Sequence, residues 1–303
     1  MEYIIINRNI FPVFLIYIYM KNILYSFYLY LFNVVEENDN SLLLEYNKDN
    51  YIFKKVYINN NDLKRKLEIL KNSNIYFYDV IFNKAGEFIT TIDNNNYILY
   101  KLDNNYPVNN NIINYININE REDTYNLWCK KIDYYYTQVI DFNVKKEELI
   151  NLFNYYAGFG EIAISLLDDI RLLDCRNSIS RKINIYPIDY NLYYDPTNII
   201  FDYSTRELAE YIKYTIINNK FNINEILNII DINNFNNIEI IYLIARVMYP
   251  NYFFNIFEDN IISEEVYDYS DFYKYIELFE YNIDLLLKSL QKKYDIPNII
   301  FRH

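Results

Sequence analysis

Residues 195–213 read DPTNIIFDYSTRELAEYIK, and this stretch predicts a turn followed by a helix. The first four residues, Asp195-Pro196-Thr197-Asn198, are typical of a turn. Ser204 and Glu207 have the spacing of a capping box, in which each side chain bonds the backbone N–H of the other residue. This spacing predicts a helix over 205–214.

Three further helices are predicted around this stretch. Apolar residues recur at helical spacing along 149–170, 238–249 and 272–290. Pro250 ends the second of these stripes, because proline cannot continue a helix. From about residue 125 onward, the chain is therefore expected to form a mainly helical lobe.

The preceding part of the chain favours strands around one helix. Residues 42–46 and 51–57 flank a turn at 47–50, which is typical of a hairpin. Leucines at positions i, i+4 and i+7 predict a helix over 62–71. Further strands are predicted over 76–83, 87–92 and 97–102. Together these segments predict a small antiparallel sheet with one helix.

The expected architecture is α+β, with a small antiparallel-sheet lobe at 41–105, a linker at 106–124 and a larger helical lobe at 125–303. Residues 1–40 are an unassigned hydrophobic segment. Within it, 10–35 is long enough to span a bilayer, although Lys21 and Asn22 divide it into two shorter runs. A membrane helix, a buried hairpin and a core helix all remain open for this segment.

The rare residues exclude several classes of site. The chain has 3 Gly, 2 Cys and 1 His, and its only histidine is the last residue, His303. No glycine-rich phosphate loop can therefore form, and catalysis by an interior histidine is excluded. The two cysteines are typical of reduced packing residues in a cytosolic protein. A net charge of -12 argues against a nucleic-acid partner, since phosphate backbones require clustered Lys and Arg.

Six strings occur in this order: 82–90 (FNKAGEFIT), 97–102 (YILYKL), 127–134 (LWCKKIDY), 153–164 (FNYYAGFGEIAI), 195–213 and 245–258 (ARVMYPNYFFNIFE). Taken in order, they resemble the spore-coat kinase-like family called CotS/YutH, and most of all its YutH branch. The resemblance extends from about residue 42 to 301. It implies a protein-kinase-like or aminoglycoside-phosphotransferase-like fold with two lobes, in an endospore-forming bacterium. It also implies a place in the mother-cell cytoplasm and the spore coat, with spore coat proteins as partners.

The resemblance also implies site residues. Kinase-like phosphoryl transfer uses a lysine on the phosphates, a glutamate that holds the lysine, and Asp and Asn side chains on magnesium. Lys54 and Glu68 are the matching candidates for nucleotide binding, and Asn198 and Asp202 are the candidates for metal binding. Each also has an ordinary interpretation: an exposed strand lysine, a solvated helix face, a turn and an acid near a helix N-terminus.

The catalytic loop departs from the pattern of active relatives, His-x-Asp-x-x-x-x-Asn. The required histidine is missing. Asp195 precedes Asn198 by three residues instead of five, and the residue five positions before Asn198 is Tyr193. The spacing matters because the base must reach the nucleophile while the Asn reaches the metal. No catalytic residue is therefore predicted.

Five residues are expected to be structural. Ser204 and Glu207 are assigned to the capping box. Arg206 and Glu210 are expected to form ion pairs or to pack within the helical lobe. Arg246 is a charge inside an apolar helix and needs a partner if it is buried, and Glu258 or Glu210 could provide one.

Three functions follow as hypotheses. The first is a catalytically degenerate, spore-coat-associated kinase-like protein that acts through binding or assembly, without a cofactor. The second is an active phosphotransferase with divergent loops, which would use ATP and magnesium. The third is a protein anchored in a membrane through residues 10–35.

Overall fold

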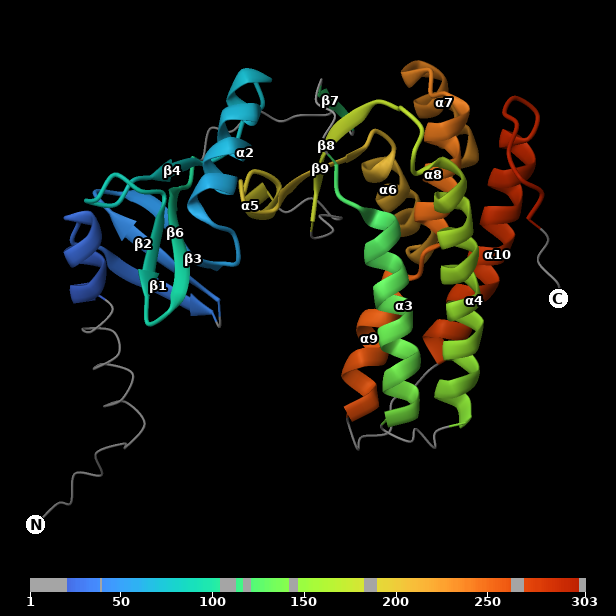
Figure 1. Ribbon diagram of the computed structural model, residues 1–303, viewed down its shortest axis with the longest axis horizontal. Coiled ribbons are helices and arrows are strands. Elements are labelled where there is room, and N and C mark those ends of the chain that lie inside the picture. Colours follow the sequence, from blue (N-terminus) through green and yellow to red (C-terminus); the bar gives the residue numbers. More distant parts are fainter. Residues whose placement is uncertain are drawn as a thin grey trace, which may run out of the picture. The chain divides into compact units, whose positions relative to one another are not determined.

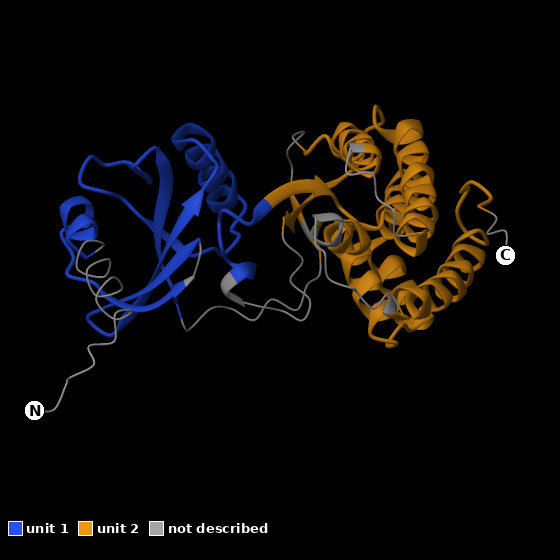
Figure 2. Cartoon of the chain, turned by 90° about the horizontal axis from the view of Figure 1, so that it is seen from below, with its two compact units in different colours: residues 1–109, 188–199 blue, residues 110–187, 200–303 orange. Residues whose placement is uncertain are grey.

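The computed structural model describes residues 21–38, 40–103, 113–116, 121–141, 147–182, 190–262 and 270–299. The chain forms two compact units (Figure 2). Unit 1 comprises Met1–Asn109 and Ile188–Ile199, and unit 2 comprises Asn110–Pro187 and Ile200–His303. Unit 1 is built on an antiparallel sheet, and unit 2 is mainly helical (Figure 1). The predicted α+β architecture with a small sheet lobe and a larger helical lobe is confirmed.

The sheet of unit 1 has six strands, in the order β1-β2-β3-β6-β4, with β5 also paired to β6. The predicted hairpin is present, but its turn is tighter than expected. Asn47 and Lys48 alone connect β2 to β3, and both have positive φ, as a type I′ turn requires. Asp93 and Asn94 connect β5 to β6 in the same way. The strands are β1 (Asn33–Asn38), β2 (Ser41–Tyr46), β3 (Asp49–Val56), β4 (Asp79–Ile81), β5 (Ile89–Ile92) and β6 (Asn95–Lys101).

Helix α2 (Asn60–Asn72) confirms the predicted leucine stripe. Leu63, Leu67 and Leu70 are buried, as their spacing on one helical face requires. The side chain of Asn59 accepts a hydrogen bond from the backbone N–H of Asp62 at 2.9 Å and so caps the first turn. The helix therefore packs by its apolar face, and its charged face remains exposed.

The described part of the hydrophobic N-terminal segment belongs to unit 1. Residues 21–28 are helical, Leu29 has a φ of 61° and strand β1 begins at Asn33, so one helix over 10–35 is not what the structure has. Leu24, Tyr28 and Phe32 are buried in the core of the sheet. Residues 10–20 lie outside the described part. Across the described part of the chain, no helix is both long and apolar enough to span a bilayer.

Unit 2 contains a small sheet and most of the helices. The sheet has the order β7-β8-β9, and β7 lies within the stretch expected to be a linker. The predicted helices at 149–170, 238–249 and 272–290 are confirmed as α4, α8 and α10. The elements are β7 (Asn114–Ile116), α3 (Thr124–Asp141), α4 (Glu147–Ile170), β8 (Asn177–Arg181), β9 (Ile199–Tyr203), α6 (Arg206–Ile217), α7 (Ile223–Asn233), α8 (Asn237–Met248), α9 (Asn251–Ile262) and α10 (Ser270–Leu290).

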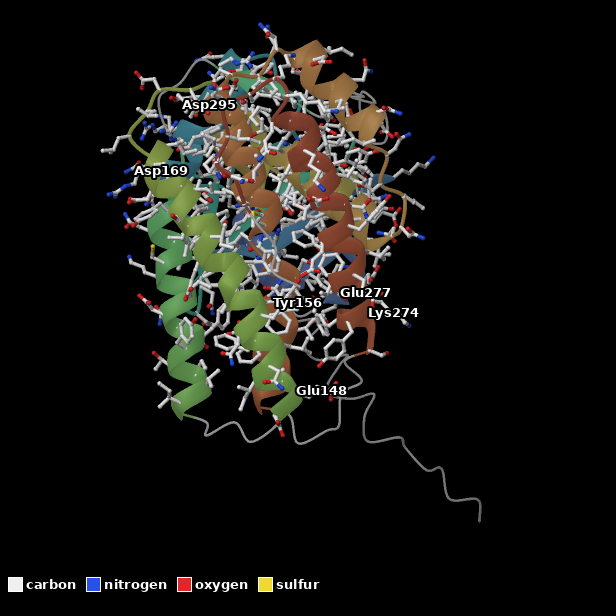
Figure 3. The ribbon with its side chains drawn as sticks, turned by 90° about the vertical axis from the view of Figure 1, so that its right-hand side faces the viewer. Glu148, Tyr156, Asp169, Lys274, Glu277 and Asp295 are labelled. Atoms are coloured by element: carbon white, nitrogen blue, oxygen red, sulfur yellow. The ribbon has the colours of Figure 1, made fainter. Side chains whose placement is uncertain are left out.

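Aromatic side chains fill the core of unit 2. Trp128 stacks on Tyr249 with ring centroids 4.0 Å apart. Helices α4 and α10 lie side by side, and Tyr156 of α4 faces α10 (Figure 3). The Tyr156 hydroxyl donates a hydrogen bond to the carbonyl of Phe272 at 3.3 Å. Aromatic residues make up 19% of the chain, and they provide much of the buried volume of this unit.

The segment 188–199 belongs to unit 1, although its position in the chain had placed it in the helical lobe. It contains α5 (Tyr190–Tyr193) and the turn that follows it. The backbone N–H of Tyr78 donates to the carbonyl of Tyr194 at 3.0 Å, and the Tyr194 ring packs edge-on against Tyr76. These contacts attach the segment to the sheet.

Candidate functional site

Lys54 lies on β3, and its ammonium group is held by an acid of unit 1. Lys54 Nζ is 2.7 Å from Asp195 Oδ2 and 3.5 Å from Thr197 Oγ1. The Asp195 side chain is fully buried, whereas the Lys54 side chain is 23% exposed. A buried carboxylate requires a compensating charge, and Lys54 provides it. The lysine expected to meet a phosphate is thus neutralised by its own chain.

Asp195 is also the residue that closes its turn. Its Oδ1 accepts hydrogen bonds from the backbone N–H of Thr197 at 2.8 Å and from the Thr197 hydroxyl at 2.6 Å. The backbone N–H of Asn198 donates to the Asp195 carbonyl at 3.0 Å. The predicted turn over 195–198 is therefore present. Both carboxylate oxygens of Asp195 have partners within unit 1.

Glu68 does not hold Lys54, which is the role that the resemblance implies for it. It lies on the exposed face of α2, and the carboxylate that meets Lys54 is Asp195. Glu68 lines a groove of ≈ 980 Å³ that runs between α2 and the β4–β5 connection. Lys64 and Lys71, its neighbours at i−4 and i+3 on the helix, line the same groove. The surroundings of Glu68 are those of a solvated helix face.

Tyrosines occupy the loop where active relatives carry catalytic residues. Tyr193, five residues before Asn198, is buried and packs edge-on against Tyr194 at 4.8 Å. A phenol in this position cannot provide the carboxylate base of a kinase-like catalytic loop. Asn198 is buried as well, and its side-chain N–H₂ donates to the carbonyl of Leu192 at 3.0 Å. The loop is thus packed into unit 1.

Asp202 lies one residue before the end of β9, in unit 2, where it is fully buried. Its Oδ1 accepts from the backbone N–H of Tyr203 at 2.7 Å, and its Oδ2 accepts from the Tyr242 hydroxyl at 3.1 Å. The guanidinium of Arg206 also donates to Oδ2. Glu122 Oε2 lies 3.7 Å from the same Arg206 nitrogen, Nη1. Asp202 is therefore neutralised by a cation of its own unit.

The candidate metal residues do not fit a magnesium ion as they stand. Mg²⁺ requires a near-octahedral set of oxygen ligands, and both oxygens of Asp202 already accept hydrogen bonds. In the described ranges, no group of three or more His, Cys, Asp and Glu side chains is arranged to hold a metal ion. We therefore assign no step of chemistry to a metal at this site.

The predicted capping box at Ser204 and Glu207 is wrong. Helix α6 has Thr205 as its N-cap, without a hydrogen bond from that side chain to the first turn. Ser204 Oγ instead donates to Glu239 Oε1 at 2.5 Å, and Glu207 Oε1 accepts from the backbone N–H of Arg181 at 2.6 Å. Both side chains are buried, so partners from other elements replace the local cap.

The capping box is found at the start of α8. Asn236 accepts from the backbone N–H of Glu239, and Glu239 accepts from the backbone N–H of Asn236. The same glutamate accepts from Arg176 at 2.7 Å, so one fully buried carboxylate joins a helix cap, a turn and an arginine. Burial raises the pKa of Glu207, another buried acid of unit 2, although Arg181 opposes this shift.

Arg246 has the partner that a buried charge requires. Of the two acids considered from the sequence, the structure pairs it with Glu210, at 2.8 Å from Arg246 Nε. Lys213 Nζ lies 3.4 Å from the same carboxylate and donates to the Tyr249 carbonyl at 3.1 Å. Burial acts to raise the pKa of Glu210, but Lys213, Arg246 and Arg206 outweigh it and lower that pKa to about 2. Burial lowers the pKa of Lys213 to about 8.

One protein family matches residues 117–279 of the sequence, which is more than half of the chain. The description of the matching family is "Spore coat putative kinase YutH". The chain belongs to this family. A search of curated proteins gives no match. The YutH-family assignment confirms the resemblance inferred from the sequence.

Solved structures confirm the fold of this YutH-family chain. An aminoglycoside phosphotransferase from Alicyclobacillus acidocaldarius has a TM-score of 0.55 at 11% identity, over 85% of this chain and 91% of the other. Spectinomycin phosphotransferase APH(9)-Ia, solved with ADP and spectinomycin, has a TM-score of 0.53 at 10% identity, over 90% and 98%. Amicoumacin kinase, solved with AMP-PNP and Ca²⁺, has a TM-score of 0.50 at 9% identity, over 88% and 93%. The fold is thus kinase-like.

Proposed function

We propose that this chain is a spore-coat kinase-like protein that has lost phosphoryl transfer and acts by binding other proteins of the endospore coat. It would be made in the cytoplasm of the mother cell and assembled into the coat. Its partners would be coat proteins, and neither nucleic acid nor a cofactor is part of the proposal. Membership of the family supports a place in the spore coat, and the geometry of the site supports the loss of phosphoryl transfer.

The observation that carries the loss of chemistry is the Lys54–Asp195 ion pair. A phosphate-binding lysine must offer its charge to the nucleotide. Here that charge compensates a fully buried carboxylate, and removing the lysine from Asp195 would leave the carboxylate unpaired. The catalytic loop agrees with this interpretation, because Tyr193 replaces its expected acid.

An active ATP-dependent phosphotransferase is the second candidate. It is favoured by the fold, since relatives of the same fold were solved with ADP and with AMP-PNP. In that case ATP and magnesium would bind with Lys54 and Asp202 displaced from their present partners. This function would require a rearrangement in each unit, because Asp195 and Arg206 would both lose their ion pairs.

Calorimetric titration of the full chain with ATP and Mg²⁺ separates the two candidates, with an active phosphotransferase of the same fold as the positive control. We expect no saturable, magnesium-dependent heat and no shift of the melting temperature. Saturable binding, followed by phosphate transfer that Asp202→Ala abolishes, would establish the second candidate instead.

A charge-preserving variant tests the role in the coat. Lys54→Arg retains a cation for Asp195, yet an arginine does not replace the phosphate-binding lysine of a kinase. In sporulating cells, we expect a tagged Lys54→Arg protein to reach the coat as the wild type does. Failure of this variant to support assembly, despite normal folding and abundance, would argue for a catalytic role.

A further inference from the structure

Two carboxylates of unit 2 converge on one nitrogen of Arg206. Arg206 Nη1 donates to Asp202 Oδ2 and lies 3.7 Å from Glu122 Oε2. Asp202 is brought there by the end of β9, and Arg206 by the first turn of α6. The backbone N–H of Glu122 donates to the Phe201 carbonyl at 3.1 Å, which holds Glu122 beside β9. A cation thus lies between two acids from separate segments.

The guanidinium acts here as a compact charge. Arginine is favoured in ion pairs for its flat fork, which can bind a carboxylate through two parallel N–H groups. The contacts with both acids run through Nη1, and Arg206 Nε is buried without a hydrogen-bond partner in the described part of the chain. Arg206 therefore neutralises the two carboxylates, while its own Nε–H donor remains without a partner.

We infer that the Arg206 guanidinium occupies the place of a divalent cation between Asp202 and Glu122. This inference rests on the proposed function, since an active site would hold magnesium at this aspartate. A cation held by two carboxylate oxygens is the arrangement that Mg²⁺ and Mn²⁺ also take, together with bound waters. Unit 2 therefore carries a two-carboxylate site that its own arginine fills.

The surroundings of the two acids would remain in place without the guanidinium. The backbone N–H of Tyr203 and the Tyr242 hydroxyl bond Asp202 independently of Arg206. The nearby charge of Arg246 is paired with Glu210 at 2.8 Å. Removing the guanidinium leaves two facing carboxylates, one fully buried and one 39% exposed, so water and a metal ion can enter from the Glu122 side.

The test is a Mn²⁺ titration of the full chain, followed by calorimetry and by electron paramagnetic resonance of free Mn²⁺. We expect Arg206→Ala to bind Mn²⁺ at least tenfold more tightly than the wild type, and Mn²⁺ to raise the melting temperature of that variant. The gain should vanish in the double variant Arg206→Ala with Asp202→Asn. Arg176→Ala is the matched control, because it breaks another arginine–glutamate pair of unit 2.

Two results would overturn the inference: a folded Arg206→Ala protein without tighter Mn²⁺ binding, or a gain that persists in the double variant. If Arg206→Ala does not fold without metal, refolding with and without Mn²⁺ decides the matter, with Arg206→Ser as a second variant. Recovery that depends on Mn²⁺ supports the inference, and failure of both variants in Mn²⁺ contradicts it. ATP is absent throughout, so the outcome is independent of phosphate transfer by the wild type.

Discussion

At the scale of single residues, the two charges expected to bind a nucleotide and its metal are each neutralised inside their own unit. Lys54 is paired with Asp195 in unit 1, and Asp202 with Arg206 in unit 2. Both acids are fully buried, so each pair removes a charge that could not otherwise be left in the interior. The proposed loss of phosphoryl transfer and the stability of the fold would therefore depend on the same contacts.

Lys54→Met should destabilise the protein, because Asp195 would remain buried without a counter-charge. We expect a loss of about 2–3 kcal/mol in the free energy of unfolding, below the roughly 3–5 kcal/mol of a fully buried pair, since Lys54 is partly exposed. Urea unfolding measures this difference. Lys55→Met is the control on the next position of β3, expected within about 0.5 kcal/mol of the wild type. Equal losses for the two variants would contradict the assignment.

The candidate residues could be predicted from the sequence only in part. The sequence predicts an ion-pair partner for Arg246, because a charge inside an apolar helix must be compensated. Glu210 is one of the two acids it offers, and the structure pairs them. The sequence around Asp195 predicts a turn, and nothing local indicates that the partner of its carboxylate is a lysine 141 positions away. Ser204 and Glu207 matched a capping box in spacing, but tertiary partners took their hydrogen bonds.

At the scale of elements, close approach of α3 and α4 depends on Gly160. A Cβ added to Gly160 would lie 2.7 Å from Ile132 Cδ1, whereas one added to Gly158 would meet no atom within 4 Å. Both glycines lie inside α4, where glycine costs about 1 kcal/mol relative to alanine. The two positions therefore separate helix propensity from packing.

Gly158→Ala should stabilise the protein by about 0.5–1 kcal/mol, through helix propensity alone. Gly160→Ala should be less stable than Gly158→Ala by about 1–3 kcal/mol, because Ile132 must move. Thermal unfolding of the two variants gives the difference. Adding Ile132→Val to Gly160→Ala should restore part of the lost free energy of unfolding. Adding it to Gly158→Ala should give no gain in stability. An equal gain from both alanines would show that Ile132 moves freely.

Elements with long apolar stripes were predictable, and short elements were not. Helices α4, α8 and α10 each repeat apolar residues over several turns, and the structure confirms them. Strand β7 has only three residues within an Asn-rich stretch, too few for a periodic signal. The helix at 21–28 and strand β1 were missed because a continuous apolar run conceals the period that separates strand from helix.

At the scale of the whole molecule, the net charge of -12 contrasts with a neutralised interior. The described buried charges are nearly all in unit 2, where acids and bases alternate between neighbouring elements. Among these carboxylates, Glu210 has its pKa lowered by the cations around it, so its contribution to stability should be lost in acid. The buried charged residues of unit 2 are Arg181, Asp202, Arg206, Glu207, Glu210, Lys213, Glu239 and Arg246.

Glu210 should make the protein sensitive to acid. Its pKa is lowered from 4.5 to about 2, so its contribution is present above pH 4.5 and is lost as the pH falls from 4.5 towards 2. The contribution is on the order of 3 kcal/mol. Glu210→Gln should unfold more easily than the wild type at pH 7, and the difference should shrink in acid.

Urea unfolding at several pH values between 7 and 3 measures this effect. Asp284→Asn is the control, because the exposed Asp284–Lys288 pair should contribute less than about 0.5 kcal/mol at any of these pH values. If the free energies of unfolding of the wild type and Glu210→Gln fell in parallel with pH, the buried network would not be the source of the acid sensitivity.

The stack of Trp128 on Tyr249 gives the molecule a built-in optical reporter. Trp128 is the single tryptophan among 37 tyrosines, and its indole is buried in unit 2 with the Arg246 guanidinium 5.6 Å from the ring. Excitation at wavelengths longer than those that tyrosine absorbs therefore selects the single indole in the core of unit 2. Its emission reports the packing of unit 2 around the Arg246–Glu210 pair, without labelling and without a signal from the sheet of unit 1.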